Sequence, residues 1–241
     1  MKIEFVYFDL DDTLVETTAT VAEAYEAALA ELRPAVAAAG GAVPPPELEA
    51  EMTGTFGSTM PEEYIRAWLY EAGVTDGLRD ELAARGAALF NEGIGGIPAF
   101  PEAGPVLERL AAEGFGLGVI TDGRVAEQRM KLERAGLAAF FGPTFISEDY
   151  PVFKHKPGQM MFRDALAAAA RPPAAVMYVG DRNKDVIGAN LAGMVSVRVR
   201  QGWANRRPSV KQFAAAQADY VIDNLGELPD LIARHNVGEK G

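Results

Sequence analysis

The sequence of 241 residues contains no cysteine. Disulfide bonds, thiolate metal sites and cysteine nucleophiles are therefore excluded, and this composition fits a protein of the reducing cytoplasm. Long apolar segments are also missing, because the apolar runs are short or are interrupted by charge, so we expect no membrane span. The N-terminus lacks the basic segment and apolar stretch of a secretion signal. We expect a cytoplasmic protein that has no membrane partner.

Basic residues are few: 23 Lys and Arg stand against 34 Asp and Glu, which gives a net charge of −11. A surface this negative repels a polyanionic backbone, so extended contact with nucleic acid is not expected. A small phosphorylated molecule remains compatible, because a local group of donors and a metal ion can reverse the field inside one cleft. The sequence leaves open whether the protein is a monomer or a homodimer.

Short apolar runs recur along the chain and alternate with helical patterns of about ten residues. The runs cover Ile3 to Phe8, Leu117 to Ile120, Thr144 to Ile146, Val176 to Val179, Val195 to Val199 and, more weakly, Tyr220 to Ile222. The helical patterns cover Ala103 to Glu113, Val125 to Ala135, Gly158 to Ala169 and Lys184 to Ala192. This alternation predicts a doubly wound α/β domain with a parallel sheet. In such sheets the chemistry takes place beyond the carboxyl ends of the strands.

The segment from Val15 to Ile97 interrupts the alternation. It shows no convincing strand, only helical stretches at Ala19 to Ala39, Pro46 to Met52, Pro61 to Ala72 and Leu78 to Asn91. A helical block of this length after the first strand is best explained as an inserted cap. We therefore predict an α/β catalytic core of residues 1–14 and 98–241 and a helical cap of residues 15–97.

Three carboxylates stand at the end of the first predicted strand: Asp9, Asp11 and Asp12. Like charges this close repel each other, so fold stability alone does not account for them. A bound cation would remove the conflict, and Mg²⁺ prefers oxygen ligands. A solvated acidic turn would also account for this cluster if it were taken alone.

A second acidic pair, Asp181 and Asp185, follows another predicted strand. If a helix begins near Asn183, Asp185 lies in its first turn and Asp181 just before it, so both can face one cation. Asp181 alone could instead be a helix cap. Two acidic strand ends in one parallel sheet favour a shared magnesium site.

Two further groups suit an anionic ligand. Thr121, Asp122 and Gly123 stand between a strand and a helix, where a hydroxyl and backbone N–H groups can bind a phosphate dianion. A helix cap with a turn glycine is the alternative explanation. Lys154 and Lys156 precede another helix, and lysine is a compact charge that can neutralise phosphate or a carboxylate. A single surface lysine, however, is most often simply solvated.

In this order the motifs resemble those of the haloacid dehalogenase superfamily of hydrolases, and the resemblance covers nearly the whole chain. Asp9 to Thr13 is similar to the first motif, Thr121 to the second, Lys156-Pro157 to the third, and Gly180-Asp181 with Asp185 to the fourth. The helical insertion between the first and second motifs resembles the branch of the family that has an α-helical cap.

The resemblance implies phosphatase chemistry. Asp9 would attack the phosphoryl group and form an aspartyl-phosphate. Asp11 would protonate the leaving alcohol and then activate the hydrolytic water. Thr121 and the backbone amides that follow it would bind the phosphoryl group, and Lys156 would balance the negative charge.

The resemblance also implies a magnesium cofactor. Asp9, the Asp11 carbonyl and Asp181 would hold Mg²⁺, with Asp185 either as a ligand or in the shell behind the ligands. The expected substrate is a phosphate monoester of a small metabolite, such as a nucleotide or a sugar phosphate.

Two positions need comment. Asp122 stands where many relatives have Asn, and we expect its side chain to point away from the phosphate or to cap the helix near Arg124. Lys154 competes with Lys156 for the third motif, although the proline that follows favours Lys156.

Three other functions remain open: a phosphomutase of the same family, a 2-haloacid dehalogenase and a catalytically idle binding protein. Asp11 argues against the dehalogenase, because a halide leaves without a proton and those enzymes resemble this pattern without the second Asp. Intact Asp9, Asp11, Lys156 and Asp181 argue against the idle protein.

Overall fold

The computed structural model describes residues 1–45, 61–151, 155–201 and 216–238. The chain forms two compact units, one of Met1–Thr18 with Ile97–Gly241 and one of Ala19–Gly96. The first boundary therefore falls after Thr18, whereas the sequence placed it after residue 14. The predicted helix from Pro46 to Met52 and the side chain of Lys154 lie outside the described residues.

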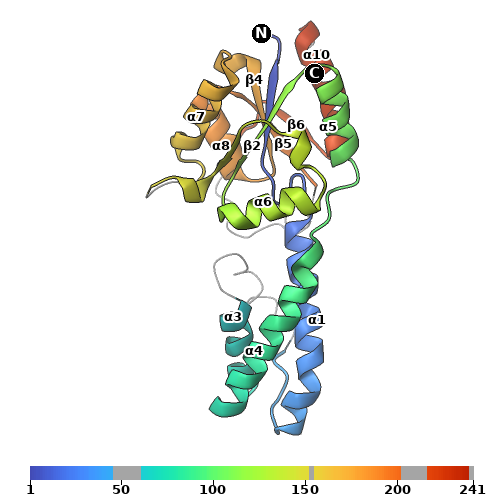
Figure 1. The fold of residues 1–241 in the computed structure, drawn as a ribbon, viewed down its shortest axis with the longest axis vertical. Coiled ribbons are helices and arrows are strands. Elements are labelled where there is room, and N and C mark those ends of the chain that lie inside the picture. Colours follow the sequence, from blue (N-terminus) through green and yellow to red (C-terminus); the bar gives the residue numbers. More distant parts are fainter. Residues whose placement is uncertain (46–60, 152–154, 202–215, 239–241) are drawn as a thin grey trace. The chain divides into compact units, whose positions relative to one another are not determined.

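The first unit is built on one six-stranded sheet (Figure 1). Its strands are β1 (Phe5–Phe8), β2 (Gly116–Thr121), β3 (Thr144–Ile146), β4 (Val176–Gly180), β5 (Val195–Val199) and β6 (Tyr220–Ile222). They pair in parallel in the order β3-β2-β1-β4-β5-β6. The chain thus winds outward in both directions from β1, which confirms the predicted doubly wound α/β fold.

Helices cover both faces of this sheet. α5 (Ala103–Ala112) and α10 (Leu228–Val237) pack on one face, and α7 (Gln159–Ala169) and α8 (Asn183–Ala192) pack on the other. α6 (Val125–Arg134) follows β2. Short 3₁₀ turns lie at Ala138–Phe140, Ser147–Asp149, Pro173–Ala175 and Leu225–Glu227.

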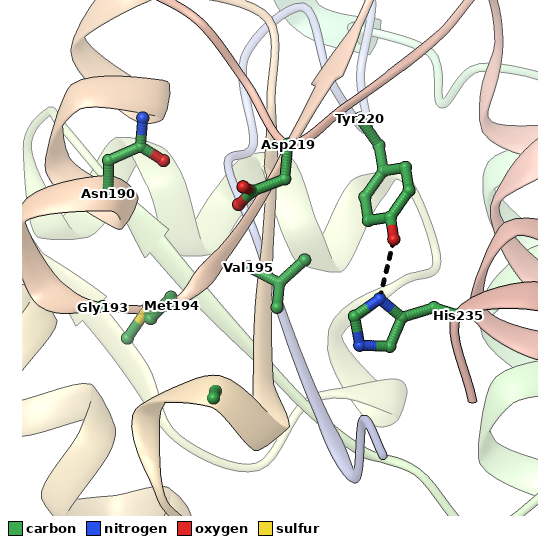
Figure 2. A pocket seen from close by; sticks show the side chains of 8 residues that line it. Asn190, Gly193, Met194, Val195, Asp219, Tyr220 and His235 are labelled. Atoms are coloured by element: carbon green, nitrogen blue, oxygen red, sulfur yellow. Dashed lines mark hydrogen bonds between the residues drawn. The ribbon is translucent and has the colours of Figure 1, made fainter. Parts of the chain in front are cut away.

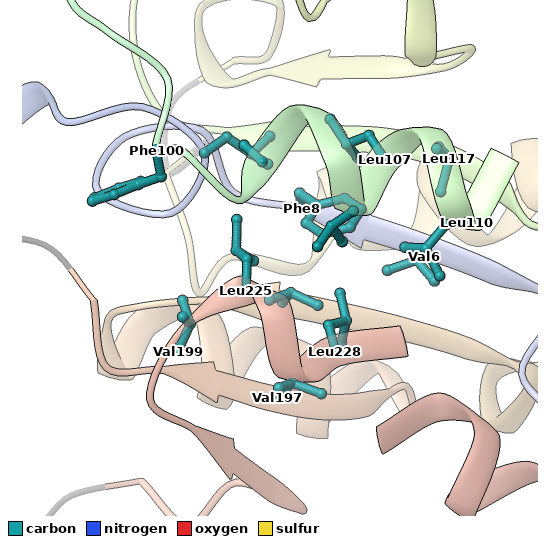
Figure 3. Packing of buried hydrophobic residues seen from close by; sticks show 14 of the residues in the cluster. Val6, Phe8, Phe100, Leu107, Leu110, Leu117, Val197, Val199, Leu225 and Leu228 are labelled. Carbon is teal, nitrogen blue, oxygen red and sulfur yellow. The ribbon is translucent and has the colours of Figure 1, made fainter. Parts of the chain in front are cut away.

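The side chains of β1 alternate between the two layers because successive residues of a strand point to opposite faces. Val6 and Phe8 join the core under α5 and α10, where Leu107 and Leu228 also pack (Figure 3). Tyr7 points to the other side, into the core with α7 and α8. Burial on both faces explains why the strand is a continuous apolar run.

The strand order determines where the polar residues after each strand meet. β1 lies between β2 and β4, with Phe8 opposite Val119 and Val179. Residues that directly follow these three strands therefore gather at one edge of the sheet. Asp9 and Asp181 come from these positions, and Thr121, the last residue of β2, lies at the same edge.

The second unit is helical and has its own core. It contains α1 (Thr17–Ala38, apart from its first two residues), α3 (Pro61–Glu71), α4 (Asp76–Gly93) and the 3₁₀ turn Ile94–Gly96. Tyr25, Leu32, Trp68 and Phe90 are buried within it. Its action as a cap remains a prediction. Among the described residues of both units, no helix has the length and apolar character needed to cross a membrane.

Two glycines of β2 make room for aromatic rings of β1. A Cβ atom on Gly118 would lie 2.3 Å from Cε1 of Tyr7 and 2.7 Å from the Pro143 carbonyl oxygen. A Cβ on Gly116 would lie 2.3 Å from Cδ2 of Phe5. The Tyr7 ring cannot simply turn away, because its hydroxyl donates a hydrogen bond to the Ala165 carbonyl at 2.7 Å.

We expect Gly118→Ala to destabilise the protein by about 1–3 kcal/mol, because the added methyl group overpacks a close contact between strands. Urea unfolding measures the effect. Gly104→Ala is the control: Gly104 lies in α5, and a Cβ atom added there would have nothing within 4 Å, so this change should be neutral or slightly stabilising. Equal stability of the two variants would contradict the proposed packing role of Gly118.

Candidate active site

Three buried carboxylates converge at the carboxyl edge of the sheet. Asp9 follows β1, Asp181 follows β4, and Asp185 lies in the first turn of α8. Each offers an oxygen atom within 4.8 Å of the others. Gly180 permits this approach, since a Cβ atom there would lie 2.6 Å from Cγ of Asp185. Three of the residues predicted to hold a cation, Asp9, Asp181 and Asp185, are therefore brought together.

Lys156 supplies a positive charge inside this cluster. Its Nζ atom lies 2.7 Å from Oδ1 of Asp9 and 2.7 Å from Oδ1 of Asp185. It also donates to the Tyr178 hydroxyl at 3.0 Å and approaches the Ile120 carbonyl at 3.3 Å. The side chain is fully buried. Burial alone would lower the pKa of Lys156, but the neighbouring Asp185 and Asp9 raise it well above its usual value.

One lysine does not balance three buried acids. Burial raises the pKa of Asp9 to about 6 even though Lys156 opposes the shift. Burial, together with the charges of Asp185 and Asp9, raises the pKa of Asp181 well above its usual value. The Oδ1 atom of Asp181 is buried and accepts no hydrogen bond from the described residues. Arg182 Nε lies 3.8 Å from the other oxygen, Asp181 Oδ2. With Lys156 and Arg182 against three acids, the site keeps an excess of negative charge and one unpartnered oxygen.

This donor set fits a hard divalent cation. Mg²⁺ takes oxygen ligands and is commonly held by one or two carboxylates, and Asp181 Oδ1 is the kind of orphaned atom that such an ion would satisfy. Asp185 is less open, because its Oδ1 contacts Lys156 and its Oδ2 accepts from the Arg182 backbone N–H at 2.9 Å. Asp9 and Asp181 would therefore be better placed than Asp185 to hold such an ion directly.

Asp11 lies beside this cluster and is held by three side chains. Lys131 Nζ lies 2.8 Å from its Oδ1, Gln128 Nε2 lies 2.8 Å from its Oδ2, and the Thr17 hydroxyl donates to Oδ1. Desolvation raises the pKa of Asp11, but the Lys131 ammonium and these hydrogen bonds outweigh it, so the pKa lies below its usual value. In this arrangement both oxygens of the Asp11 carboxyl group are engaged.

The side chain of Asp12, the third acid at this strand end, lies toward the start of α1. Its Oδ1 accepts from the Thr18 backbone N–H at 2.8 Å, and its Oδ2 accepts from the Thr18 hydroxyl. Its backbone adopts a left-handed conformation with φ of 59°, which is uncommon outside glycine but tolerated by Asp. Asp12 therefore has a structural role.

Thr121 is buried and is the last residue of β2, the strand end that was predicted for it. Binding of phosphate by its hydroxyl remains a prediction. Two of the backbone amides after it are already engaged: the Gly123 N–H donates to Ser147 Oγ at 3.1 Å, and the Val125 N–H donates to Glu148 Oε2 at 2.7 Å. These two amides are therefore not open donors in this conformation.

Asp122 does not cap the helix near Arg124, which is one of the two orientations expected for it. Its Oδ1 accepts from the Lys156 backbone N–H at 3.0 Å, and its Oδ2 lies 2.6 Å from Lys184 Nζ. Desolvation raises the pKa of Asp122, but Lys156 and Lys184 outweigh it and lower the pKa. A carboxylate cannot donate to phosphate, so the side chain instead joins three segments of the site.

The sequence reasoning missed several residues that complete the site. Tyr178 lies within an apolar run and was assigned to the strand core, yet its hydroxyl donates to the Ile120 carbonyl at 2.9 Å beside Lys156. Thr17 and Lys184 gave no signal, because each is an ordinary polar residue near a helix start. Gln128 and Lys131 could have been suspected, since a polar pair at i and i+3 shares one helix face.

A separate cavity of about 510 Å³ lies at the opposite edge of the sheet, where β5 and β6 begin (Figure 2). Its polar groups already have protein partners. Tyr220 and His235 are hydrogen bonded at 2.9 Å, His235 Nε2 lies 3.0 Å from the Met1 carbonyl, and Asp219 accepts from the Ser196 N–H at 2.8 Å. The carboxylate cluster is therefore the stronger candidate site.

Comparison with known proteins agrees with the motifs. A family model described as haloacid dehalogenase-like hydrolase matches residues 6–199. A glyceraldehyde 3-phosphate phosphatase from Methanopyrus kandleri is 32% identical over 237 residues, which cover 95% of this chain and 97% of that protein. A phosphoglycolate phosphatase from Cereibacter sphaeroides is 29% identical over 231 residues, which cover 95% of this chain and 97% of that protein.

Among solved structures, the crystal structure of a 2-haloacid dehalogenase from Pseudomonas syringae is similar with a TM-score of 0.59. It is 30% identical in sequence, and the match covers 97% of this chain and 99% of that one. The chain is thus similar along its length both to phosphatases and to a dehalogenase.

The contact between Asp122 and Lys184 predicts an energetic coupling. In a double-mutant cycle of Asp122→Asn and Lys184→Met, we expect a coupling of about 1 kcal/mol in urea unfolding, because the two side chains are in contact and partly buried. Glu4→Gln with Arg171→Met is the control, and this half-exposed pair should couple more weakly. Strict additivity of Asp122→Asn and Lys184→Met would contradict the ion pair.

Proposed function

The chain belongs to the haloacid dehalogenase-like hydrolase family and to its phosphatase type, and we propose that it hydrolyses a phosphate monoester of a small metabolite with Asp9 as nucleophile. The observation that carries the proposal is the convergence of Asp9, Asp181 and Asp185 around one point with Lys156 among them. Such a site can hold a divalent cation and gather the charges that phosphoryl transfer requires.

In the first half of the reaction, an oxygen of Asp9 forms a bond to phosphorus while the bond from phosphorus to the leaving oxygen breaks. Asp11 enters this step in its protonated form and gives that proton to the leaving oxygen, so the product departs as a neutral alcohol. The phosphoryl group is then carried by Asp9 as an aspartyl-phosphate. Lys156, 2.7 Å from Asp9, offsets the negative charge that accumulates.

In the second half, Asp11 takes a proton from water, and the water oxygen attacks phosphorus. The bond from phosphorus to Asp9 breaks, which restores the nucleophile and releases inorganic phosphate. Thr121 is suited to donate to a phosphoryl oxygen because its buried hydroxyl stands at the end of β2, next to β1.

Mg²⁺ is the cation that we propose for the site, held by Asp9, the Asp11 carbonyl and Asp181, with Asp185 supporting it. When bound, it would neutralise phosphoryl oxygens and allow a carboxylate to approach a dianion. Asp181 Oδ1, which has no hydrogen bond from the described residues, supports this assignment.

The names of the relatives suggest a class of substrate, which we propose for this chain. Those named above act, by name, on glyceraldehyde 3-phosphate and phosphoglycolate. Short phosphorylated carbon chains are therefore the first compounds to test, beside the sugar phosphates and nucleotides that the sequence favours.

A 2-haloacid dehalogenase is the second candidate, because one similar structure carries that name. Asp11 distinguishes the two reactions, since a halide leaves without a proton whereas an alkoxide needs one. Release of chloride from a 2-haloacid that persists without Mg²⁺, with no phosphate released from esters, would favour the dehalogenase.

We expect Asp9→Asn to reduce turnover by roughly 10⁴-fold or more, because the amide cannot replace the nucleophile. Phosphate release from a panel of phosphorylated metabolites with Mg²⁺ measures it, and circular dichroism checks the fold. The control is Asp230→Asn, the same chemical change at an exposed residue of α10, which should retain wild-type turnover. Activity of Asp9→Asn equal to that of the wild type would exclude Asp9 as the nucleophile.

Removal of metal ions with a chelator should abolish turnover, and added Mg²⁺ should restore it. In Asp181→Asn we expect the Mg²⁺ concentration for half-maximal activity to rise by at least about tenfold, because a charged ligand is lost. Isothermal titration with Mg²⁺ gives an independent measurement of binding. Unchanged Mg²⁺ affinity in this variant would remove Asp181 from the ligand set.

A further inference from the structure

Two buried side chains of α6 contact the carboxyl group of Asp11. Lys131 Nζ is 2.8 Å from Oδ1, and Gln128 Nε2 is 2.8 Å from Oδ2. The two residues are three positions apart, so they lie on the same face of the helix and reach one group. Lys131 is 5% exposed and Gln128 is 1% exposed.

Burial of the Gln128 amide is unfavourable for the stability of the fold. Its Nε2 has three acceptors nearby: Asp11, the Asp122 carbonyl at 2.6 Å and the Thr121 hydroxyl at 3.4 Å. Its Oε1 atom is buried and receives no hydrogen bond from the described residues. An unsatisfied buried acceptor is unfavourable, so a core position filled for stability alone would be better served by an apolar residue.

The absence of a side chain at Gly123 leaves space for the Gln128 amide. A Cβ atom on Gly123 would lie 2.5 Å from Gln128 Nε2, and Gly123 has φ of 148°, which side chains rarely adopt. Lys131 has one other ion-pair partner in the described part of the chain, Glu127 at 2.8 Å, whose side chain is half exposed. The inward contact of Lys131 is therefore the one to Asp11.

We propose that Lys131 and Gln128 are positioning residues that hold the Asp11 carboxyl group in the orientation needed to deliver its proton to the leaving oxygen. The inference rests on the proposed phosphatase function. Both residues act through the Asp11 carboxyl group that they contact. Proton transfer needs a donor within hydrogen-bond reach, and a misplacement of about 1 Å can cost roughly 10²-fold in rate. Without these two contacts, only the Thr17 hydroxyl among the described residues still holds the Asp11 side chain, which is then less restricted to one rotamer.

The identity of the leaving group separates this role from a purely structural one. An alkyl phosphate must release an alcohol and depends on the proton from Asp11. In 4-nitrophenyl phosphate the phenolate leaves as a stable anion and depends on it far less. The ratio kcat/KM includes only steps up to loss of the leaving group, so it reports the half of the reaction in which Asp11 acts as an acid.

The test uses Lys131→Met and Gln128→Leu, with Asp11→Asn as the reference. For the best alkyl phosphate of the panel, we expect kcat/KM to fall by about 10- to 100-fold in each α6 variant, whereas for 4-nitrophenyl phosphate it should change by less than about threefold. Asp11→Asn should show the same selectivity with a larger loss. Arg129→Met, which removes an exposed cation from the same helix, should leave both values unchanged.

Thermal unfolding first establishes that each variant is folded. If Lys131→Met does not fold, the comparison of the two esters is made with Gln128→Leu alone. Equal losses for both esters in the folded variants would overturn the positioning role while leaving the phosphatase function intact. If the wild-type protein releases no phosphate from any ester with Mg²⁺, the proposed function itself fails, and the positioning role fails with it.

Discussion

A buried lysine among buried acids is the interaction on which the site depends. Three carboxylates lie within 4.8 Å of one another at the edge of the sheet, where desolvation and mutual repulsion both disfavour their charged forms. Lys156 contacts Asp9 and Asp185 from a fully buried position and makes this gathering possible. It does not reach the open oxygen of Asp181. Lys156 and the half-exposed Arg182, whose Nε lies 3.8 Å from Asp181 Oδ2, thus supply two positive charges for three acids. The remaining imbalance is what makes a divalent cation a fitting occupant.

The same principle of local compensation extends to the acids around the cluster. Asp11 is paired with Lys131 and Asp122 with Lys184, so both of these carboxylates near the nucleophile have their own ammonium group. The net charge of −11 therefore does not describe the field that a substrate meets. Pairing at short range lets an acidic protein present a site for an anion, because a pair of opposite charges has little effect beyond its immediate surroundings.

The sequence was sufficient to predict the fold and the principal acids, because both depend on simple patterns. Apolar runs that alternate with helices predict a doubly wound sheet, and the residues after neighbouring strands must meet, which explains Asp9 and Asp181. The contacts of Tyr178, Lys184 and Asp122 could not be predicted, because they depend on the reach of side chains between segments that are distant in sequence. Asp122 illustrates the difference. Its charge could be identified as unusual, but its partner, 62 positions away, could not be identified without the structure.

The surroundings of Asp11 bear on which of the family's reactions this chain performs. A shared fold does not determine the leaving atom, since one architecture supports several chemistries. The burial of Lys131 and Gln128 has a desolvation cost that an apolar pair would avoid. A halide displacement would gain nothing from a second carboxylate held in this way, because no proton has to be delivered. A reaction that must protonate an oxygen and later deprotonate water gains a fixed acid and base. The energetic cost around Asp11 is therefore more easily explained by hydrolysis of a phosphate ester than by removal of a halide.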